Sequence, residues 1–291
     1  CIRDRVTVMR DGRTVGTRSV PDTDVGELIN LMVGRTIDEQ ISKRKVEIGE
    51  PVLVVDGLAR DGALSPISLS VGAGEILGVA GLMGSGRTEL ARAIFGADPV
   101  DSGTVEVDGR RLPGANPAAS IAAGLGFLTE DRKQQGVVLQ MSVGQNITLT
   151  SLDQDTRHGM LDLARECARA GALVDTLHIR APSLDQEVVN LSGGNQQKVV
   201  LAKWLAAGCR ALLFDEPTRG IDVGAKAEIY ELIGDLVERG VAVVLISSEM
   251  PELLGLADRI AVMHEGSLQG ILDRADASQE RIMELALQFT A

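Results

Sequence analysis

The sequence predicts an α/β fold in which a mostly parallel β-sheet is covered by helices on both faces. Short apolar runs rich in β-branched residues alternate with helical patterns between residues 51 and 248. These runs have no polar face, so both sides of each strand must be buried. In sheets of this kind, ligands bind at the carboxyl ends of the strands.

Composition narrows the class of protein. The chain has 291 residues, of which 44% are hydrophobic and 24% are charged, and its net charge is −12. These values are ordinary for a globular protein, and the acidic balance argues against nucleic acid as the main partner. No apolar run approaches the length of about 18 residues that a membrane span needs. Three widely spaced cysteines predict neither a disulfide framework nor a metal cluster, and favour a reducing cytosol.

The first two predicted strands cover residues 51–58 and 75–82, and a helix is predicted over residues 87–96. The glycine-rich stretch GLMGSGRTEL, residues 81–90, connects the second strand to this helix. Its glycines let the backbone turn tightly and aim N–H groups at one point, next to the positive end of the helix. The pattern is that of a phosphate-binding loop in which Thr88 binds Mg²⁺, except that Arg87 stands where the pattern has lysine.

The next two elements come from the stretch LSGGNQQKV, residues 191–199, and from the strand ALLFDEP, residues 211–217. Ser192 is a natural N-cap for a helix over residues 195–207, and the two glycines after it expose backbone N–H groups. Asp215 and Glu216 end the strand, where they can hold Mg²⁺ through water and polarise an attacking water. Taken singly, residues 191–199 would favour an ordinary capped helix, and residues 211–217 a strand that ends in a solvated acidic turn.

The last predicted helix covers residues 225–240, and a buried strand over residues 241–248 completes the predicted sheet. Residues 4–12, DRVTVMRDG, are repeated as DRIAVMHEG at 258–266, an offset of 254 that persists without a gap. Each copy predicts a hairpin followed by a helix. We therefore expect residues 1–45 to be the tail of a preceding, similar domain with its linker, and residues 46–291 to form the main domain. The alternative is that residues 1–45 are an independent hairpin-and-helix extension.

The order of the three motifs resembles that of the ATP-binding cassette (ABC) ATPases, and the resemblance covers residues 52–275. The stretches GLMGSGRTE, EDRK (130–133) and DEPTRGIDVGAK (215–226) are similar to a narrower group, the second cassettes of tandem ATPase subunits of bacterial monosaccharide importers. The resemblance implies a P-loop NTPase fold with an antiparallel β subdomain and a helical subdomain that carries the LSGG motif. ATP and Mg²⁺ are the implied cofactors.

The resemblance also implies roles for individual residues. Asp215 would hold Mg²⁺ with Thr88, and Glu216 would be the catalytic base. Asp222 would lie at the interface of a head-to-tail dimer with the first cassette of the same chain, whose ATP the LSGG motif would contact. The residues expected to contact nucleotide are Gly81, Gly84, Ser85, Gly86, Arg87, Thr88, Glu89, Ser192, Gly193, Gly194 and Asp222.

This chain departs from the family pattern in its own site. Arg87 replaces lysine, Glu130 replaces a glutamine that senses Mg²⁺, and Ser248 replaces a histidine that contacts the γ-phosphate. We assign catalytic roles to Glu130 and Ser248, and a metal-binding role to Glu130 as well. No aromatic residue near the first strand can stack on adenine, so Arg60 is the candidate. We expect asymmetry, in which this site is degenerate while the LSGG motif serves the other site.

The implied partners are membrane permease subunits that insert helices near residues 130–145, and indirectly a periplasmic or lipid-anchored sugar-binding protein. The implied location is the cytoplasmic face of the inner membrane, as a peripheral subunit. Two alternatives stay open: a non-hydrolysing regulatory or dimerisation cassette, and a soluble cassette ATPase in translation or repair. The short linker and the acidic charge argue against the second alternative.

Overall fold

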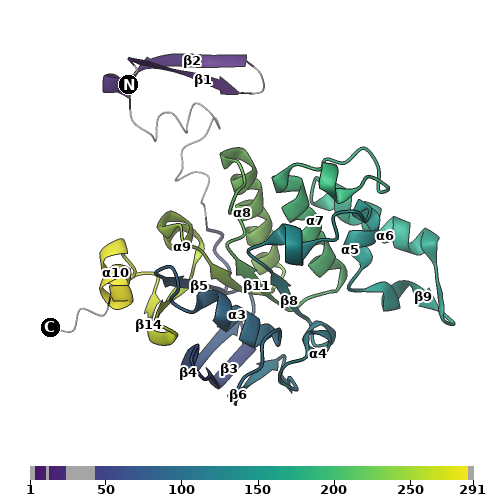
Figure 1. Cartoon of the computed structure of the whole chain (residues 1–291), viewed down its shortest axis with the longest axis horizontal. Coiled ribbons are helices and arrows are strands. Elements are labelled where there is room, and N and C mark those ends of the chain that lie inside the picture. The colour runs from purple at the N-terminus through teal and green to yellow at the C-terminus, as the bar shows by residue number, and fades with distance from the viewer. Residues whose placement is uncertain (1–3, 11–12, 24–42, 288–291) are drawn as a thin grey trace.

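A six-stranded sheet forms the centre of the molecule. The computed structural model describes residues 4–10, 13–23 and 43–287. The strands lie in the order β14-β13-β5-β12-β11-β8, and Figure 1 labels β14, β5, β11 and β8. Five of them are parallel, and β14 is antiparallel at one edge. Their bounds are β5 Ile76–Gly81, β8 Leu125–Leu128, β11 Ala211–Asp215, β12 Ala242–Ile246, β13 Arg259–His264 and β14 Ser267–Asp273.

Helices surround this sheet, and a helical group extends from it. The helices are α3 Arg87–Phe95, α4 Pro117–Ala122, α5 Val143–Thr148, α6 Leu163–Thr176, α7 Gly193–Ala206, α8 Val223–Glu238, α9 Met250–Leu256 and α10 Gln279–Leu287. The long helix α7 packs against α5 and α6, and the short strands β9 Thr156–Arg157 and β10 Met160–Leu161 pair beside them (Figure 1). The five residues of β11 are all buried, as are those of β12, as expected for strands covered on both faces.

Most predicted elements are confirmed within one to three residues. The helices predicted over 87–96, 195–207 and 225–240 are α3, α7 and α8, and three predicted strands are β5, β11 and β12. The prediction for the first strand was wrong in one respect. Instead of joining the parallel sheet, β3 (Pro51–Arg60) pairs antiparallel with β4 (Leu64–Gly72) and β6 (Ser102–Val107), and β7 (Arg110–Arg111) follows β6. Asp56 is exposed in β3, because an antiparallel sheet can leave one face to water.

The repeat seen in the sequence has the same backbone register in both copies. In the first hairpin, β1 (Arg5–Arg10) pairs with β2 (Arg13–Ser19), with a bulge between Val8 and Met9. In the second, β13 pairs with β14, with a bulge between Val262 and Met263, at the same offset. Residues 24–42, where the first copy predicts its helix, lie outside the described residues.

The end of the predicted linker is bound to the main domain. Lys43 forms an ion pair with Asp258, and Arg44 reaches Asp235 at 2.6 Å and Glu238 at 2.5 Å. The backbone N–H of Gly49 donates to the carbonyl of Ala73 at 2.9 Å. In the part of the chain that the structure describes, no helix has the length and apolar character to cross a membrane.

Candidate functional site

The glycine-rich loop leaves β5 and enters α3 at the carboxyl end of the sheet. A Cβ on Gly81 would lie 2.3 Å from Ser85 Oγ and 2.6 Å from the carbonyl oxygen of Met263. Gly86 has φ of 95°, and a Cβ there would lie 2.9 Å from the backbone of Gly266. Both contacts are shorter than any side chain tolerates, so the loop takes this path only with glycine. The loop therefore packs closely against the β13–β14 hairpin and leads directly into the N-terminus of α3, a position at which anions bind.

Asp215 ends β11 as a buried carboxylate without hydrogen bonds. Its side chain is 1% exposed, and neither of its oxygens has a hydrogen-bond partner among the described residues. Burial, and to a lesser extent the neighbouring Glu216, raise the pKa of Asp215 to about 6. The Thr88 hydroxyl lies near enough to oppose this shift in pKa, although no hydrogen bond of good geometry satisfies the carboxylate. A buried charge left in this state needs a cation.

These residues fit Mg²⁺ bound with a nucleotide. Asp215 and Thr88 supply a carboxylate and a hydroxyl, the oxygen ligands that Mg²⁺ prefers. Ser85, in the loop, is also buried with its hydroxyl unsatisfied. Among the described residues, no group of three or more His, Cys, Asp or Glu side chains could enclose a metal by itself. This agrees with an ion that takes its remaining ligands from phosphate and water.

Arg87, Glu216 and Ser248 come together from three different elements. Arg87 donates to the carbonyl of Ser247 at 3.0 Å, and its guanidinium lies 3.6 Å from Glu216 Oε1. The hydroxyl of Ser248 donates to Glu216 Oε2 at 3.0 Å. Each oxygen of the Glu216 carboxylate therefore faces one residue that departs from the family pattern, Arg87 or Ser248. In this structure, the charge of Arg87 is directed at Glu216.

The backbone of Glu216 is also constrained. Its φ is 49°, a left-handed conformation that few residues other than glycine adopt. The N–H of Glu216 donates to the carbonyl of Ile246 at 3.0 Å, which ties the end of β11 to the end of β12. Strain of this kind persists only where the surroundings enforce it, and it is common at functional sites.

The LSGG motif caps α7, and no described hydrogen bond joins Ser192 to Arg87, Glu216 or Ser248. Ser192 Oγ accepts from the side-chain nitrogen of Asn195 at 3.0 Å. A Cβ on Gly193 would lie 2.6 Å from a guanidinium nitrogen of Arg132, and one on Gly194 would lie 2.9 Å from the Cβ of Ala225. Gly194 leaves room for Ala225, whereas the Arg132 side chain near Gly193 could move aside, and Ser192 is exposed.

The remaining predicted residues have other contacts. Glu130 forms an ion pair with Arg219, and Asp222 caps α8 by accepting from the N–H of Ala225 at 3.0 Å. Arg60 donates to Asp98 at 2.7 Å, so a salt bridge holds the candidate for adenine stacking. Glu89 is exposed in the first turn of α3. No contact in the described residues brings Glu130 to Thr88 or Asp215.

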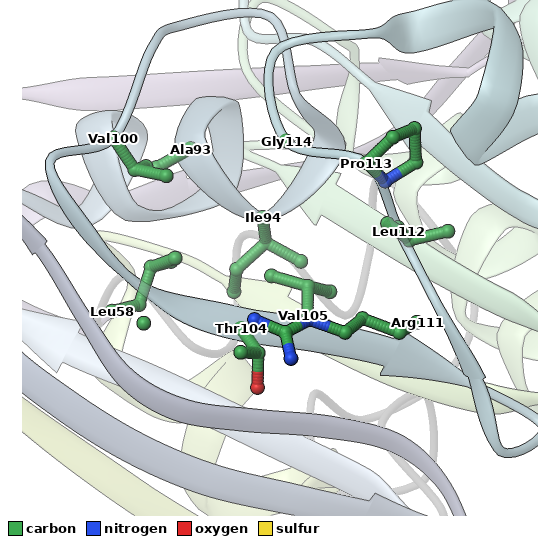
Figure 2. Close-up of a pocket in the computed structure, with 11 residues that line it drawn as sticks. Leu58, Ala93, Ile94, Val100, Thr104, Val105, Arg111, Leu112, Pro113 and Gly114 are labelled. Atoms are coloured by element: carbon green, nitrogen blue, oxygen red, sulfur yellow. The ribbon is translucent and has the colours of Figure 1, made fainter.

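A cavity of about 350 Å³ lies at the opposite end of α3 from the glycine-rich loop. Figure 2 shows Ile94 of α3 facing Leu58 and Val105 of the antiparallel sheet, with Arg111 at its side. Most residues that line the cavity are aliphatic, and none of them is a predicted site residue. The cavity is therefore separate from the candidate site.

The sequence reasoning missed a group of hydrogen bonds around Glu252, which joins the segments that carry Glu216 and Ser248. Thr218, Tyr230 and Ser247 all donate to one buried carboxylate, Glu252 of α9. One signal in the sequence could have revealed it. Glu252 lies one turn before the buried Leu256, so the two residues share one face of a short helix.

A family model described as ABC transporter matches residues 64–219. The chain is similar to the ribose import ATP-binding protein RbsA 1 of Rubrobacter xylanophilus, at 54% identity over 98% of this chain and 57% of that protein. It is 50% identical to RbsA of Bacillus licheniformis, over 98% of this chain and 58% of that protein. The chain thus spans little more than half the length of these relatives.

A solved structure supports the fold independently. A nucleotide-free ATP-binding cassette from an ABC transporter superposes with a TM-score of 0.68, over 81% of this chain and 98% of that one. The two sequences are 19% identical, so this likeness is one of fold.

Proposed function

The chain belongs to the ABC transporter family of ATP-binding proteins, and on this premise we propose that it is one of two cassettes of a tandem ATPase that powers import of a monosaccharide. Members of this family bind ATP with Mg²⁺ and hydrolyse it. The observation that carries the proposal is the unsatisfied Asp215 carboxylate beside Thr88 and the glycine-rich loop. The Thr88 hydroxyl and the charge of Arg87 oppose the rise in the pKa of Asp215, but burial outweighs both.

Each residue of the cluster has a task in this proposal. The loop N–H groups between Gly81 and Thr88 hold the phosphates, and bound Mg²⁺ neutralises charge on them. Asp215 and Thr88 hold the ion. Glu216 orients the attacking water and accepts its proton. Ser248 fixes the second oxygen of Glu216, at 3.0 Å, so that the carboxylate keeps one orientation.

The tandem arrangement is supported by the two hairpins. Residues 1–45 would be the tail of the first cassette with the linker, and residues 46–291 the second cassette. The pairing of β1 with β2 matches that of β13 with β14 residue for residue, bulge included. A bulge at the same place in both copies is typical of related domains.

The proposals for the sugar and the partners are based on the similar proteins. The proteins that resemble this chain are ribose import ATP-binding proteins, so ribose or a related monosaccharide is the proposed cargo. Permease subunits would dock near residues 130–145, at the cytoplasmic face of the membrane, and a sugar-binding protein would act on its other side.

We also propose that this half carries the degenerate site. Arg87 contacts Glu216 and Ser247 rather than pointing free into the loop. To help bind phosphate, it must leave a carboxylate and a carbonyl, and this competition weakens binding. A wide, planar guanidinium is also a poor substitute for a compact ammonium in a loop shaped for lysine. A cassette that only binds nucleotide is the second candidate, and the same contact favours it.

The test uses the full tandem protein with its permease. Arg87→Lys is expected to raise ATP turnover a few-fold, and Glu216→Gln to lower it less than the matching change in the first cassette. If Glu216→Gln abolishes turnover as completely as that matching change, the asymmetry is wrong. If millimolar Mg-ATP fails to stabilise this chain in thermal unfolding, the nucleotide site itself is wrong.

A further inference from the structure

A buried carboxylate outside the predicted site joins the loops that carry Glu216 and Ser248. Glu252 lies in α9 and is 1% exposed. Its Oε1 accepts from the hydroxyls of Thr218 at 2.6 Å and Tyr230 at 2.5 Å, and its Oε2 accepts from Ser247 at 2.7 Å. Lys226 adds a positive charge 3.6 Å from Oε1.

The donors come from three separate segments. Thr218 lies two residues after Glu216, in the turn that leaves β11. Ser247 lies between β12 and Ser248. Tyr230 belongs to α8, on which Lys226 also lies. Burial and then the charge of Glu252 raise the pKa of the Tyr230 hydroxyl, so this group stays protonated and continues to donate.

These contacts form a closed ring that includes Arg87 and Glu216. Ser247 donates its hydroxyl to Glu252, while its carbonyl accepts from Arg87 at 3.0 Å. Arg87 faces Glu216 at 3.6 Å, and the chain leads from Glu216 through Pro217 to Thr218. Thr218 then returns to Glu252. Glu252 is therefore connected to Glu216 along two paths, one through Thr218 and one through Ser247 and Arg87.

We propose that Glu252 is a positioning residue for Glu216. It holds the turn 216–222 and the turn 247–249 at a fixed separation, and thereby sets where the base stands relative to the glycine-rich loop. A carboxylate is required because it accepts from three hydroxyls at once. An amide of the same shape replaces one acceptor oxygen with an N–H donor, which then faces a hydroxyl that already donates. The role in turnover rests on the proposed ATP hydrolysis, but the role in loop position does not.

The first experiment measures turnover in the full tandem protein, with the first cassette's own base removed so that this site is read alone. Glu252→Gln is expected to lower kcat roughly ten- to hundredfold with little change in KM for Mg-ATP, because a misplaced base affects the chemical step. Thr218→Val is expected to share the loss, and Thr218→Ser, which keeps the hydroxyl, to recover most of it. Glu284→Gln, an exposed acid on α10, is the matched control.

The second experiment separates this proposal from the proposed function. Hydrogen exchange of the same variants is expected to rise in residues 216–222 and 247–249, and to stay unchanged in residues 76–95. A uniform rise through the chain, or protection unchanged in either turn, overturns the positioning role. If Glu216→Gln leaves the turnover of this site unchanged while the two turns still loosen in Glu252→Gln, then hydrolysis here is wrong and the positioning role stands.

Discussion

At the scale of single residues, the site contains a charge that its surroundings do not satisfy. Asp215 lies at the end of a fully buried strand and lacks hydrogen bonds in the described structure. A protein designed for stability alone would not keep such a group, because a buried carboxylate without a partner costs free energy. Its presence is explained if the stable state is the one with a bound cation.

Replacing Asp215 tests this explanation. Asp215→Asn is expected to raise the stability of the nucleotide-free chain at neutral pH, on the order of 2–3 kcal/mol for a pKa raised by about two units. The same change is expected to abolish the extra stability that Mg-ATP confers. Denaturant unfolding with and without Mg-ATP measures both effects. An Asn variant that is less stable without nucleotide, or one that keeps the response to Mg-ATP, contradicts the assignment.

The sign of the pH dependence follows from the same group. The pKa of Asp215 is raised to about 6 in the folded protein, above its ordinary value of 3.8. The folded state therefore binds this proton more tightly than the unfolded state does. The destabilisation is fully present above pH 6 and is relieved as the pH falls from 6 towards 4. Between pH 4 and 6, the stability difference between Asp215→Asn and the parent chain should shrink as the pH falls.

At the scale of elements, the sequence was most informative where strands are buried on both faces. Residues 211–215 and 242–246 are continuous apolar runs because helices cover the sheet, and such runs are visible without a structure. Residues 51–60 read almost the same, yet they form an antiparallel strand. Strand direction depends on which partner lies alongside. That partner, residues 64–72, alternates buried apolar residues with serines, a pattern typical of an antiparallel strand.

The candidate site divides in the same way. The phosphate loop, the acidic end of β11 and the LSGG motif each lie within a short stretch of sequence, so each can be recognised from the sequence alone. The contacts of Glu216 with Arg87 and Ser248 span 129 and 32 positions, by subtraction of the residue numbers, and depend on how three strand ends meet. Spacing alone cannot predict side-chain contacts of that kind.

The segment before β3 is an element of this domain rather than a free connector. A Cβ on Gly72 would lie 2.7 Å from both the carbonyl of Gly49 and the side chain of Ile48, and one on Gly74 would lie 2.9 Å from Val46. These glycines make room for residues 46–49 along the domain. The ion pairs of Lys43 and Arg44 extend the same attachment. The boundary proposed at residue 46 therefore lies inside a bound segment, which begins by residue 43.

Adding a methyl group at Gly72 tests this attachment. Gly72→Ala is expected to destabilise the chain by about 1–3 kcal/mol, because the added Cβ meets backbone that cannot move aside as a side chain can. Gly171→Ala, in the middle of α6, is the control, since its nearest neighbour would lie 4.0 Å away. Alanine there should be neutral or stabilising by up to about 1 kcal/mol. Thermal unfolding of both variants gives the comparison, and equal stability of the two contradicts the packing of residues 46–49 against Gly72.

At the scale of the whole molecule, the two nucleotide motifs of this chain serve different purposes in the proposed tandem. The loop at 81–88 and the acids at 215–216 meet at one edge of the sheet, where they form a single cluster. Ser192 is exposed at the start of α7, and no described contact joins it to that cluster. An exposed anion-binding helix end without a contact to its own phosphate loop is suited to a nucleotide held by another domain.

This separation leads to a prediction about communication between the cassettes. In the full tandem protein, Ser192→Arg is expected to reduce total ATP turnover at least tenfold, because its bulk blocks the ATP held by the first cassette. The same change in this chain alone should leave the affinity for Mg-ATP unchanged, since Ser192 does not contact the chain's own loop. Calorimetric titration of the isolated chain and phosphate release by the tandem provide the two measurements. Loss of Mg-ATP binding by the isolated variant would show that the LSGG motif serves its own loop. Unchanged turnover of the tandem would show that it serves neither site, and in both cases the head-to-tail arrangement is wrong.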